Sequence, residues 1–251
     1  MENYFEKQFE LRYFEMNKMG VSSPTTILTL LEETAADHCD SINQSLYHLL
    51  TKNVGWVLLS GALVMDRYPK YKEKITIRTW LSSYSSIKGF RENLIFDEQQ
   101  NIIGRGKGLW LFFDIEKRKP IQIFDTFIQN WSFCNEQSLT HNIAKKIEPI
   151  NEAIYTKEFH VHRFDTDMNK HVNNIRYLQW TMESIPDEMV DYYFLHAIEG
   201  RFIAEAQLGD TVISLTQKGE LPNTFIHTIK VKETNKVCAV ANTIWKKIYA
   251  E

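Results

Sequence analysis

The stretch that decides the fold occurs twice in this chain: Phe9–Ser23 reads FELRYFEMNKMGVSS, and Phe159–Asn174 reads FHVHRFDTDMNKHVNN. Each copy begins with alternating apolar and polar residues, passes through Met-Asn-Lys and runs into a helix start. A second echo follows in the same order, because Phe90–Trp110 and Phe225–Trp245 share one Phe-to-Trp spacing. Each has a turn-like centre, at Gln99–Asn101 and Thr234–Lys236. Two echoes in one order indicate a duplicated chain.

Each copy leads into a predicted helix. Ser23 is a good N-cap, and Pro24 suits the first helical position. Apolar residues then recur at helical spacing from Ile27 to His38. In the second half Asn173 or Asn174 can cap a helix that ends before Pro186.

Strands follow each helix. They are rich in β-branched and aromatic residues and are separated by turn residues. The predicted strands are Gly55–Val64, Lys74–Leu81, Phe90–Phe96 and Lys107–Phe113 in the first half, and Gly200–Ala206, Thr211–Gln217, Thr224–Val231 and Val237–Tyr249 in the second. One helix followed by antiparallel strands is an α+β plan in which the sheet wraps the helix. The chain therefore divides into residues 1–130, a connector over 131–150 and residues 151–251.

Composition narrows the class of protein. The 251 residues are 43% hydrophobic and 24% charged, as in ordinary globular proteins, and the net charge of -3 gives no reason to expect nucleic acid as a partner. No uncharged apolar run approaches the roughly 20 residues that a membrane span needs, and the charged N-terminus shows no signal peptide. The odd and widely spaced Cys39, Cys134 and Cys238 predict reduced thiols rather than a disulfide framework or a zinc site. We therefore expect a cytoplasmic protein without a bound metal.

The block from Asp167 to Asn174, followed by Tyr177 and Trp180, resembles the signature of the acyl-acyl carrier protein (acyl-ACP) thioesterases of fatty acid synthesis. Weaker similarities cover nearly the whole chain; they are Arg12–Glu15 with Gly20, Leu31–His38, Trp56, Tyr68-Pro69, Thr79-Trp80, and Trp110 with Asp114. The resemblance implies an α+β tandem double hotdog, in which each half is a long helix wrapped by an antiparallel sheet. It also implies an acyl pocket in the first hotdog, catalysis in the second and no cofactor.

Catalytic residues follow from the resemblance. It assigns Asp167, Asn169 and His171, with a downstream glutamate that is best matched by Glu205. In extended backbone a D-x-N-x-H triplet would place its three side chains on one face. The unpaired N–H groups and positive dipole of the following helix predict an oxyanion site around 172–174.

Thioester hydrolysis needs an activated water and a stabilised carbonyl oxygen, because a thiol with a pKa of about 8.5 leaves readily. We expect Glu205 to activate the water, or Asp167 if Glu205 proves distant. Asn169 would hold the water or the carbonyl oxygen, and His171 would polarise the thioester or protonate the thiol. The residues alone also allow a plainer interpretation, in which Asp167 and Asn169 form a turn, His171 bonds to backbone, and the two asparagines only cap the helix.

The first half lacks this chemistry. Aligning the two Met-Asn-Lys triplets places Met19 opposite His171, and the counterpart of Glu205 falls near Tyr68. We therefore predict that the first half supplies an apolar acyl wall, with Leu28, Leu31, Trp56, Leu58 and Ser60 as its candidates. Plant members of the family carry a cysteine directly after the glutamate, whereas this chain has Ala206, which excludes a cysteine nucleophile at that position.

The implied partner is an acyl carrier protein with a phosphopantetheine-linked acyl chain. Because acyl carrier proteins are acidic, the basic residues Arg176, Lys88, Arg91 and Lys170 are candidate contacts. A monomer or a homodimer is expected. The alternatives are an acyl-CoA thioesterase of the same fold, a hotdog dehydratase and a non-enzymatic acyl-carrier-binding module.

Overall fold

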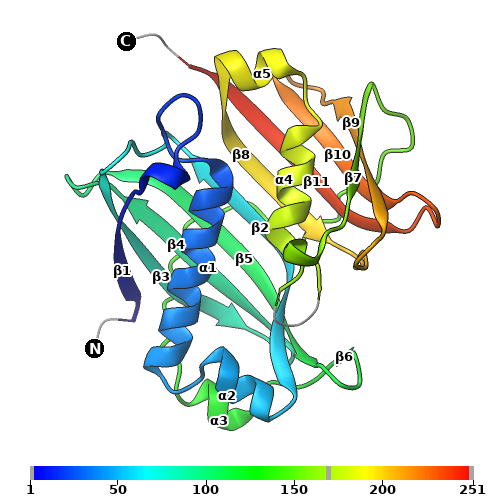
Figure 1. The fold of residues 1–251 in the computed structure, drawn as a ribbon. Helices are drawn as coiled ribbons and strands as arrows, with labels where there is room; N and C mark the ends of the chain where they lie inside the picture. The colour runs from blue at the N-terminus through cyan, green and yellow to red at the C-terminus, as the bar shows by residue number, and fades with distance from the viewer. Residues whose placement is uncertain (1–2, 168–170, 249–251) are drawn as a thin grey trace. The chain divides into compact units, whose positions relative to one another are not determined.

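The computed structural model describes residues 3–167 and 171–248 (Figure 1). The chain divides into two units, Met1–Ala144 and Lys145–Glu251. The division falls within the segment that we predicted as a connector, so residues 131–144 belong to the first unit.

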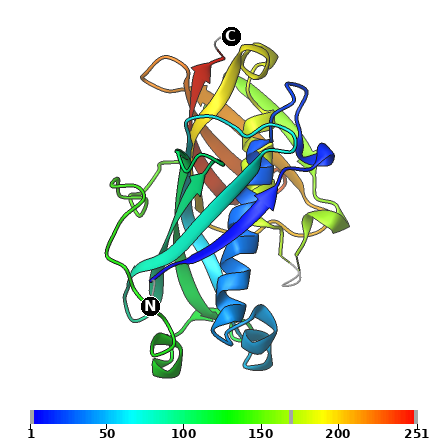
Figure 2. The ribbon, with the colours of Figure 1, turned by 90° about the vertical axis from the view of Figure 1, so that its left-hand side faces the viewer.

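The first unit is a long helix laid across an antiparallel sheet (Figures 1 and 2). Its elements are β1 (Phe5–Glu10), the 3-10 turn η1 (Tyr13–Glu15), α1 (Pro24–Ser41), α2 (Leu46–Thr51), β2 (Val54–Met65), β3 (Lys74–Tyr84), β4 (Lys88–Phe96), β5 (Ile102–Asp114), β6 (Lys119–Pro120) and α3 (Asp125–Ile128). The strand order is β1-β3-β4-β5-β2, and β6 pairs with β5. Every pairing recorded among these strands is antiparallel.

The second unit repeats this plan. Its elements are β7 (Tyr155–His160), the 3-10 turn η2 (Arg163–Asp165), α4 (Asn174–Glu183), α5 (Asp187–Tyr192), β8 (Tyr193–Phe202), β9 (Thr211–Lys218), β10 (Thr224–Val231) and β11 (Val237–Lys247). Its order β8-β11-β10-β9-β7 matches that of the first unit strand for strand, read from the other end. The two units therefore share one topology, as the sequence echoes predicted.

Local signals set the two helix starts. Ser23 caps α1 by accepting a hydrogen bond from the Thr26 N–H, and Pro24 occupies the first position. Asn173 caps α4 by accepting from the Ile175 N–H. Each helix then buries one face against its own sheet; the buried residues are Ile27, Leu30, Thr34 and His38 in α1, and Tyr177, Leu178, Trp180 and Thr181 in α4.

The strand before Glu205 differs from its prediction. We expected a strand over Gly200–Ala206, but β8 runs from Tyr193 to Phe202. Residues 203–210 therefore form a loop, and Glu205 lies in it. The short helices α2, α3 and α5 were not predicted, because each has too few residues for a visible helical period.

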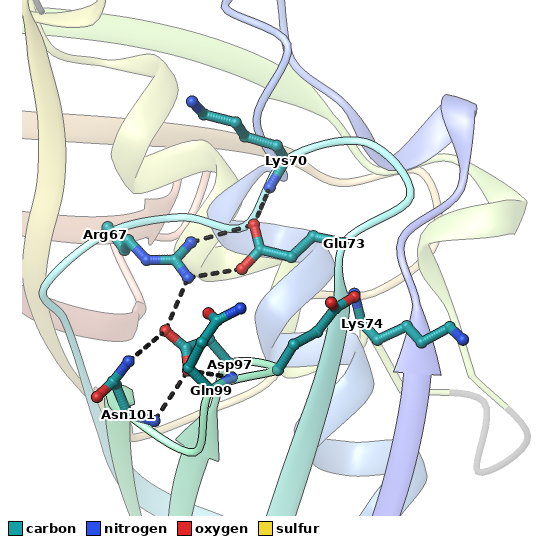
Figure 3. A network of polar contacts seen from close by, with 8 residues as sticks. Arg67, Lys70, Glu73, Lys74, Asp97, Gln99 and Asn101 are labelled. Atoms are coloured by element: carbon teal, nitrogen blue, oxygen red, sulfur yellow. Dashed lines mark hydrogen bonds and ion pairs between the residues drawn. The ribbon is translucent and has the colours of Figure 1, made fainter.

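A polar network joins two loops at one end of the first sheet (Figure 3). The Arg67 guanidinium donates to both Glu73 carboxylate oxygens, at 2.6 and 3.1 Å, and to Asp97 at 3.2 Å. Asp97 also accepts from the backbone N–H groups of Gln99 and Asn101, which closes the β4–β5 turn. The network therefore fixes the ends of β2, β3 and β4 relative to one another.

A buried ion pair lies on the sheet face opposite α1. It binds residues near the end of the first unit to the sheet. Lys107 Nζ lies 3.3 Å from Glu92 Oε1, and Glu92 is fully buried. Lys107 donates to the Leu139 carbonyl, while Ser138 donates to Glu92. Residues 137–139 are thus bound to the outer face of β4 and β5, and Figure 2 shows this segment on the side away from α1.

Candidate active site

Before α4, residues 165–167 lie beside residues 171–173. Thr166 and Val172 form an antiparallel bridge, and the Asp167 N–H donates to the His171 carbonyl at 2.8 Å. Asp167 Oδ1 accepts from the His171 N–H at 3.4 Å. Asp167 therefore lies opposite His171 in an antiparallel pairing, which an extended D-x-N-x-H segment would not allow, so that prediction is wrong.

Asn169 lies outside the described residues, as does Lys170. Its role stays a prediction.

His171 and Glu205 form the centre of the site. His171 Nδ1 lies 3.0 Å from Glu205 Oε1, although the two residues come from different loops. Their side chains are 25% and 30% exposed, so the pair is accessible to solvent. Glu205 is therefore the carboxylate that contacts the His171 imidazole, and it is not distant from the site.

The Glu205 loop is held on both sides. The Cys238 carbonyl in β11 accepts from the N–H groups of Ile203 and Ala204, at 2.8 and 3.2 Å. Further along the loop, Asp210 Oδ2 accepts from the Gln207 N–H at 2.8 Å. A carboxylate carried on a loop fixed in this way is positioned with little freedom to move.

The start of α4 supplies a backbone donor beside His171. The Asn173 N–H donates to the Asp165 carbonyl, and the Ile175 N–H donates to the Asn173 side chain. Among the residues that the structure describes, the Asn174 N–H has no acceptor. The Asn173 N–H is therefore excluded from the predicted oxyanion region around 172–174, and the Asn174 N–H stays a candidate donor.

Structural equivalence corrects our alignment of the two halves. The bridge Met16↔Ser22 in the first unit corresponds to Thr166↔Val172, and the Asn17 N–H donates to the Val21 carbonyl as Asp167 does to that of His171. Asn17 is thus the counterpart of Asp167, and Val21 that of His171. The alignment of the two Met-Asn-Lys triplets therefore pairs the halves two residues out of register.

The counterpart of Glu205 is Tyr68, as predicted. Leu11 and Val161 occupy equivalent positions after β1 and β7, and they bond to Glu73 and Asp210 in the same way. Counting back from these two positions places Tyr68 opposite Glu205. The first unit therefore has a valine and a tyrosine where the second has the histidine and the glutamate.

Leu31 and Leu58, both predicted acyl-wall residues, lie over one stretch of β5. A Cβ on Gly106 would lie 3.1 Å from Leu31 Cδ1, and a Cβ on Gly108 would lie 3.3 Å from Leu58 Cδ1. Alternate strand residues share a face, so both leucines lie on the α1 side of the sheet. Leu28 is a half-buried residue of the same helix.

Trp56 and Ser60, the other two predicted acyl-wall residues on β2, lie on opposite faces of the sheet. Trp56 packs on Phe112, with ring centroids 4.9 Å apart, within the cluster that α2 covers. A bulge after Leu58 places Ser60 opposite Leu109, which packs with Leu139 and Ile143 on the face away from α1. Ser60 is therefore on the other side of the sheet from Leu31 and Leu58.

Arg91, a predicted carrier contact, is 6% exposed and donates to Thr79 while contacting His38. It cannot belong to a carrier-binding surface, and that prediction is wrong. Arg176 is partly exposed and pairs with Asp165 at 3.3 Å, and Lys88 is half-buried in β4.

Among the described residues, no helix combines the length and apolarity needed to cross a membrane. The model of the acyl-ACP thioesterase N-terminal domain matches residues 2–131, and that of the C-terminal domain matches residues 148–247.

Curated relatives include an oleoyl-acyl carrier protein thioesterase of Arabidopsis thaliana, 24% identical over 97% of this chain and 76% of its own length. A chloroplastic oleoyl-acyl carrier protein thioesterase of Coriandrum sativum is 28% identical over 84% of this chain and 62% of its own length.

Two solved structures are similar over almost the whole chain. An acyl-ACP thioesterase from Bacteroides thetaiotaomicron is 21% identical with a TM-score of 0.87, covering 97% of this chain and 98% of its own. The 12:0-ACP thioesterase of Umbellularia californica is 18% identical with a TM-score of 0.88, covering 99% of both chains. The predicted α+β double hotdog fold is thereby confirmed. Matched by both domain models of the family, the chain belongs to the acyl-ACP thioesterases and is a thioester hydrolase that acts on acyl-ACP.

Proposed function

We propose that His171 and Glu205 carry out the hydrolysis and that the first unit holds the acyl chain. The observation that carries this proposal is the 3.0 Å approach of His171 Nδ1 to Glu205 Oε1 in the second unit. The first unit has Val21 and Tyr68 at these places, and neither can serve as a general base at neutral pH.

Glu205 acts as the general base. It takes a proton from a water whose oxygen attacks the carbonyl carbon of the thioester, and the carbonyl electrons move onto oxygen. When the carbonyl re-forms, the C–S bond breaks and the electron pair leaves with sulfur. His171 gives a proton to the departing sulfur, so the products are a free fatty acid and the carrier thiol.

The tetrahedral oxyanion needs hydrogen-bond donors. The Asn174 N–H at the start of α4 is one candidate, and the positive end of that helix favours the negative charge. Asn169 is the proposed side-chain donor to this oxygen or to the water. Asp167 acts through the backbone of the turn, because it bonds to both the N–H and the carbonyl of His171.

Acyl recognition is assigned to residues 1–130. Leu28, Leu31 and Leu58 are the proposed wall, since Leu31 and Leu58 approach β5 where glycines leave room beneath α1. Trp56 adds an aromatic surface further along the same sheet face. Ser60 is left out because it points to the opposite face.

The substrate is presented by an acyl carrier protein through its phosphopantetheine arm. We propose Arg176 and Lys88 as charged contacts, because acidic carriers are attracted by basic side chains near the site. A reducing, cytoplasmic location fits the three free cysteines. The chain acts as a monomer or a homodimer, which sedimentation of the purified protein distinguishes.

The test is hydrolysis of a series of acyl-ACP substrates of increasing chain length, with matched acyl-CoA substrates, by wild type, His171→Ala and Glu205→Gln. Free thiol release measures hydrolysis, and enoyl formation would reveal a dehydratase. Each variant should lower kcat by roughly a hundredfold or more, the usual scale for losing an oriented acid–base group.

Val21→Ala and Tyr68→Phe are the matched controls, because they alter the counterparts of His171 and Glu205 in the first unit. Both should keep kcat within about twofold. Full activity in Glu205→Gln would remove Glu205 from the chemistry, and binding of acyl-ACP without turnover by wild type would overturn the enzymatic assignment.

A further inference from the structure

We propose that Tyr177 is a positioning residue that sets Glu205 against His171. This inference rests on the proposed function of the His171–Glu205 pair and adds a residue to which the resemblance gives no role. The Tyr177 hydroxyl bonds to the backbone N–H of Ala206, so it would act through the backbone of the Glu205 loop.

The contact is a buried hydrogen bond. The Ala206 N–H donates to the Tyr177 hydroxyl oxygen at 2.9 Å, and the two residues are only 1% and 2% exposed. Burial raises the pKa of the Tyr177 phenol, so it stays neutral, and the nearby Glu205 and Asp210 act in the same direction. A buried amide that lost this acceptor would be left unsatisfied, at an energetic cost that the loop can avoid only by moving.

Helix α4 connects this bond to His171. His171 stands three residues before the helix, and Tyr177 lies in its first turn. The Tyr177 ring packs against Trp180 in the same helix, with centroids 5.4 Å apart, and against Phe202 at the end of β8, at 6.1 Å. His171 therefore lies just before a short helix whose first turn holds the residue after Glu205.

The bond to Tyr177 holds the Glu205 loop on the side that follows Glu205 in the sequence. Backbone bonds to the Cys238 carbonyl fix residues 203 and 204, before Glu205. The bond to Tyr177 fixes residue 206, directly after it. Glu205 is thus held between two anchors, and removal of the second would free its backbone on the side facing α4.

The first unit shows that the fold does not require this bond. By the structural equivalence given above, Ile27 is the counterpart of Tyr177, and Pro69 is the counterpart of Ala206. Isoleucine has no hydroxyl, and proline has no N–H to donate. The donor and the acceptor are therefore both absent from the unit that also lacks the histidine and the glutamate, which links the bond to the chemistry rather than to the hotdog fold.

The experiment is a double-mutant cycle with Tyr177→Phe and Glu205→Gln in the full chain, measured with acyl-ACP. Tyr177→Phe removes one oxygen and keeps the ring contacts. In the wild-type background it should lower kcat by roughly ten- to a hundredfold, the range expected for a misplaced catalytic group, while KM changes by less than about twofold. In the Glu205→Gln background it should change the remaining rate by less than about twofold, because two residues that act as a unit are not additive.

A second variant, Ala206→Pro, removes the donor in place of the acceptor and copies Pro69 of the first unit. It should reproduce the loss in kcat, and adding Tyr177→Phe to it should have little further effect. Hydrogen exchange of the Ala206 amide, followed by NMR, should be faster in Tyr177→Phe than in wild type. Tyr68→Phe, which also removes a buried tyrosine hydroxyl, should leave kcat unchanged.

The outcomes separate the two proposals. A Glu205→Gln variant with full kcat would overturn the proposed catalytic pair itself. If Glu205→Gln is inactive but Tyr177→Phe has wild-type kcat, or if Tyr177→Phe lowers the rate equally in both backgrounds, the positioning role is wrong. Unchanged exchange of the Ala206 amide in Tyr177→Phe would also exclude it.

Discussion

The histidine side chains of this protein are of two kinds. Some are exposed enough to react, and others are buried in their neutral form. His171 belongs to the first kind, because its side chain is 25% exposed beside a carboxylate. His227 belongs to the second. It is fully buried in β10 and bonds to Thr216 and Thr243 on its two sides. The same type of side chain is therefore partly exposed in one place and packed in the core in another.

His227 should make the protein sensitive to mild acid. Burial lowers the pKa of His227 to about 3, whereas an unfolded histidine titrates near about 6.5. Between these values the unfolded state binds more protons, so stability falls as the pH falls, by up to about 1.4 kcal/mol per unit for one histidine. Urea unfolding at several pH values should show a shallower slope in His227→Gln than in wild type.

His38, whose pKa is also lowered to about 3 by burial and by Arg91, adds a slope of the same sign that persists in this variant. His48→Gln, at a residue on the short helix α2, is the control and should leave the slope as in wild type. An equal slope in His227→Gln and wild type would show that His227 is not held neutral.

The cysteines should be dispensable for catalysis. Burial raises the pKa of the Cys238 thiol to about 11 and also raises the pKa of Cys39, so neither forms a thiolate readily. Ala206 has no thiol to offer beside Glu205. A variant carrying Cys39→Ser, Cys134→Ser and Cys238→Ala should keep kcat within about threefold and resist thiol-blocking reagents. A trapped acyl-cysteine with burst kinetics would contradict this expectation.

Among the elements, the polar network of Figure 3 stabilises one end of the first sheet. Desolvation opposes the charge on Asp97, but hydrogen bonds from Asn101 and Arg67 outweigh it and lower the pKa of Asp97. The same balance lowers the pKa of Glu73, where Arg67 and the Lys70 N–H are the main partners. One guanidinium thus holds two carboxylates in place.

Arg67→Met should therefore lower the melting temperature at neutral pH, by roughly 2–6 °C for a chain of this size. Both carboxylates have lowered pKa values, so their contribution is present above the ordinary carboxylate pKa and is lost as the pH falls through the folded value. The difference from wild type should shrink as the pH is lowered towards about 3. Arg105→Met is the control, because it removes one exposed ion pair to Asp66 and should change the melting temperature little.

At the scale of the whole molecule, two units of one topology carry different residues at equivalent places. Val21 and Tyr68 stand where His171 and Glu205 stand, and Ile27 and Pro69 stand where Tyr177 and Ala206 stand. A unit released from catalysis can use its helix and sheet to bind an apolar chain. Under the proposed function, the duplication would let specificity and chemistry change separately.

Substitutions in the first unit should shift chain-length preference and leave the chemistry intact. Leu31→Phe enlarges a side chain beneath α1 and should favour shorter acyl-ACP substrates, while Leu31→Ala should admit longer ones. Each methylene discriminates by only about 1–3 kcal/mol, so the profile should shift without loss of the best kcat. Turnover across a chain-length series measures this. Loss of all turnover in folded Leu31 variants, with altered chain preference in His171→Ala, would reverse the assignment of the two units.

Most of the local structure could be predicted from the sequence. The N-caps at Ser23 and Asn173, the strand Thr224–Val231 and the turns centred on Gln100 and Asn235 all depend on residues close together in the chain. Gln100 and Asn235 even share a positive φ, of 64° and 54°. Short-range propensity and period are properties of a few neighbouring residues, so the printed sequence contains them.

The sequence by itself determined the duplication, the helix and strand plan and the family. The tertiary structure decided which residues meet. It ended β8 before Glu205, buried Arg91, turned Ser60 away from α1 and corrected the pairing of the two halves by two residues. It also brought Ala206 to Tyr177 and Glu205 to His171. These contacts depend on strand register and on the path of the loops, and both are set by packing between segments distant in the chain, which no local pattern of residues specifies.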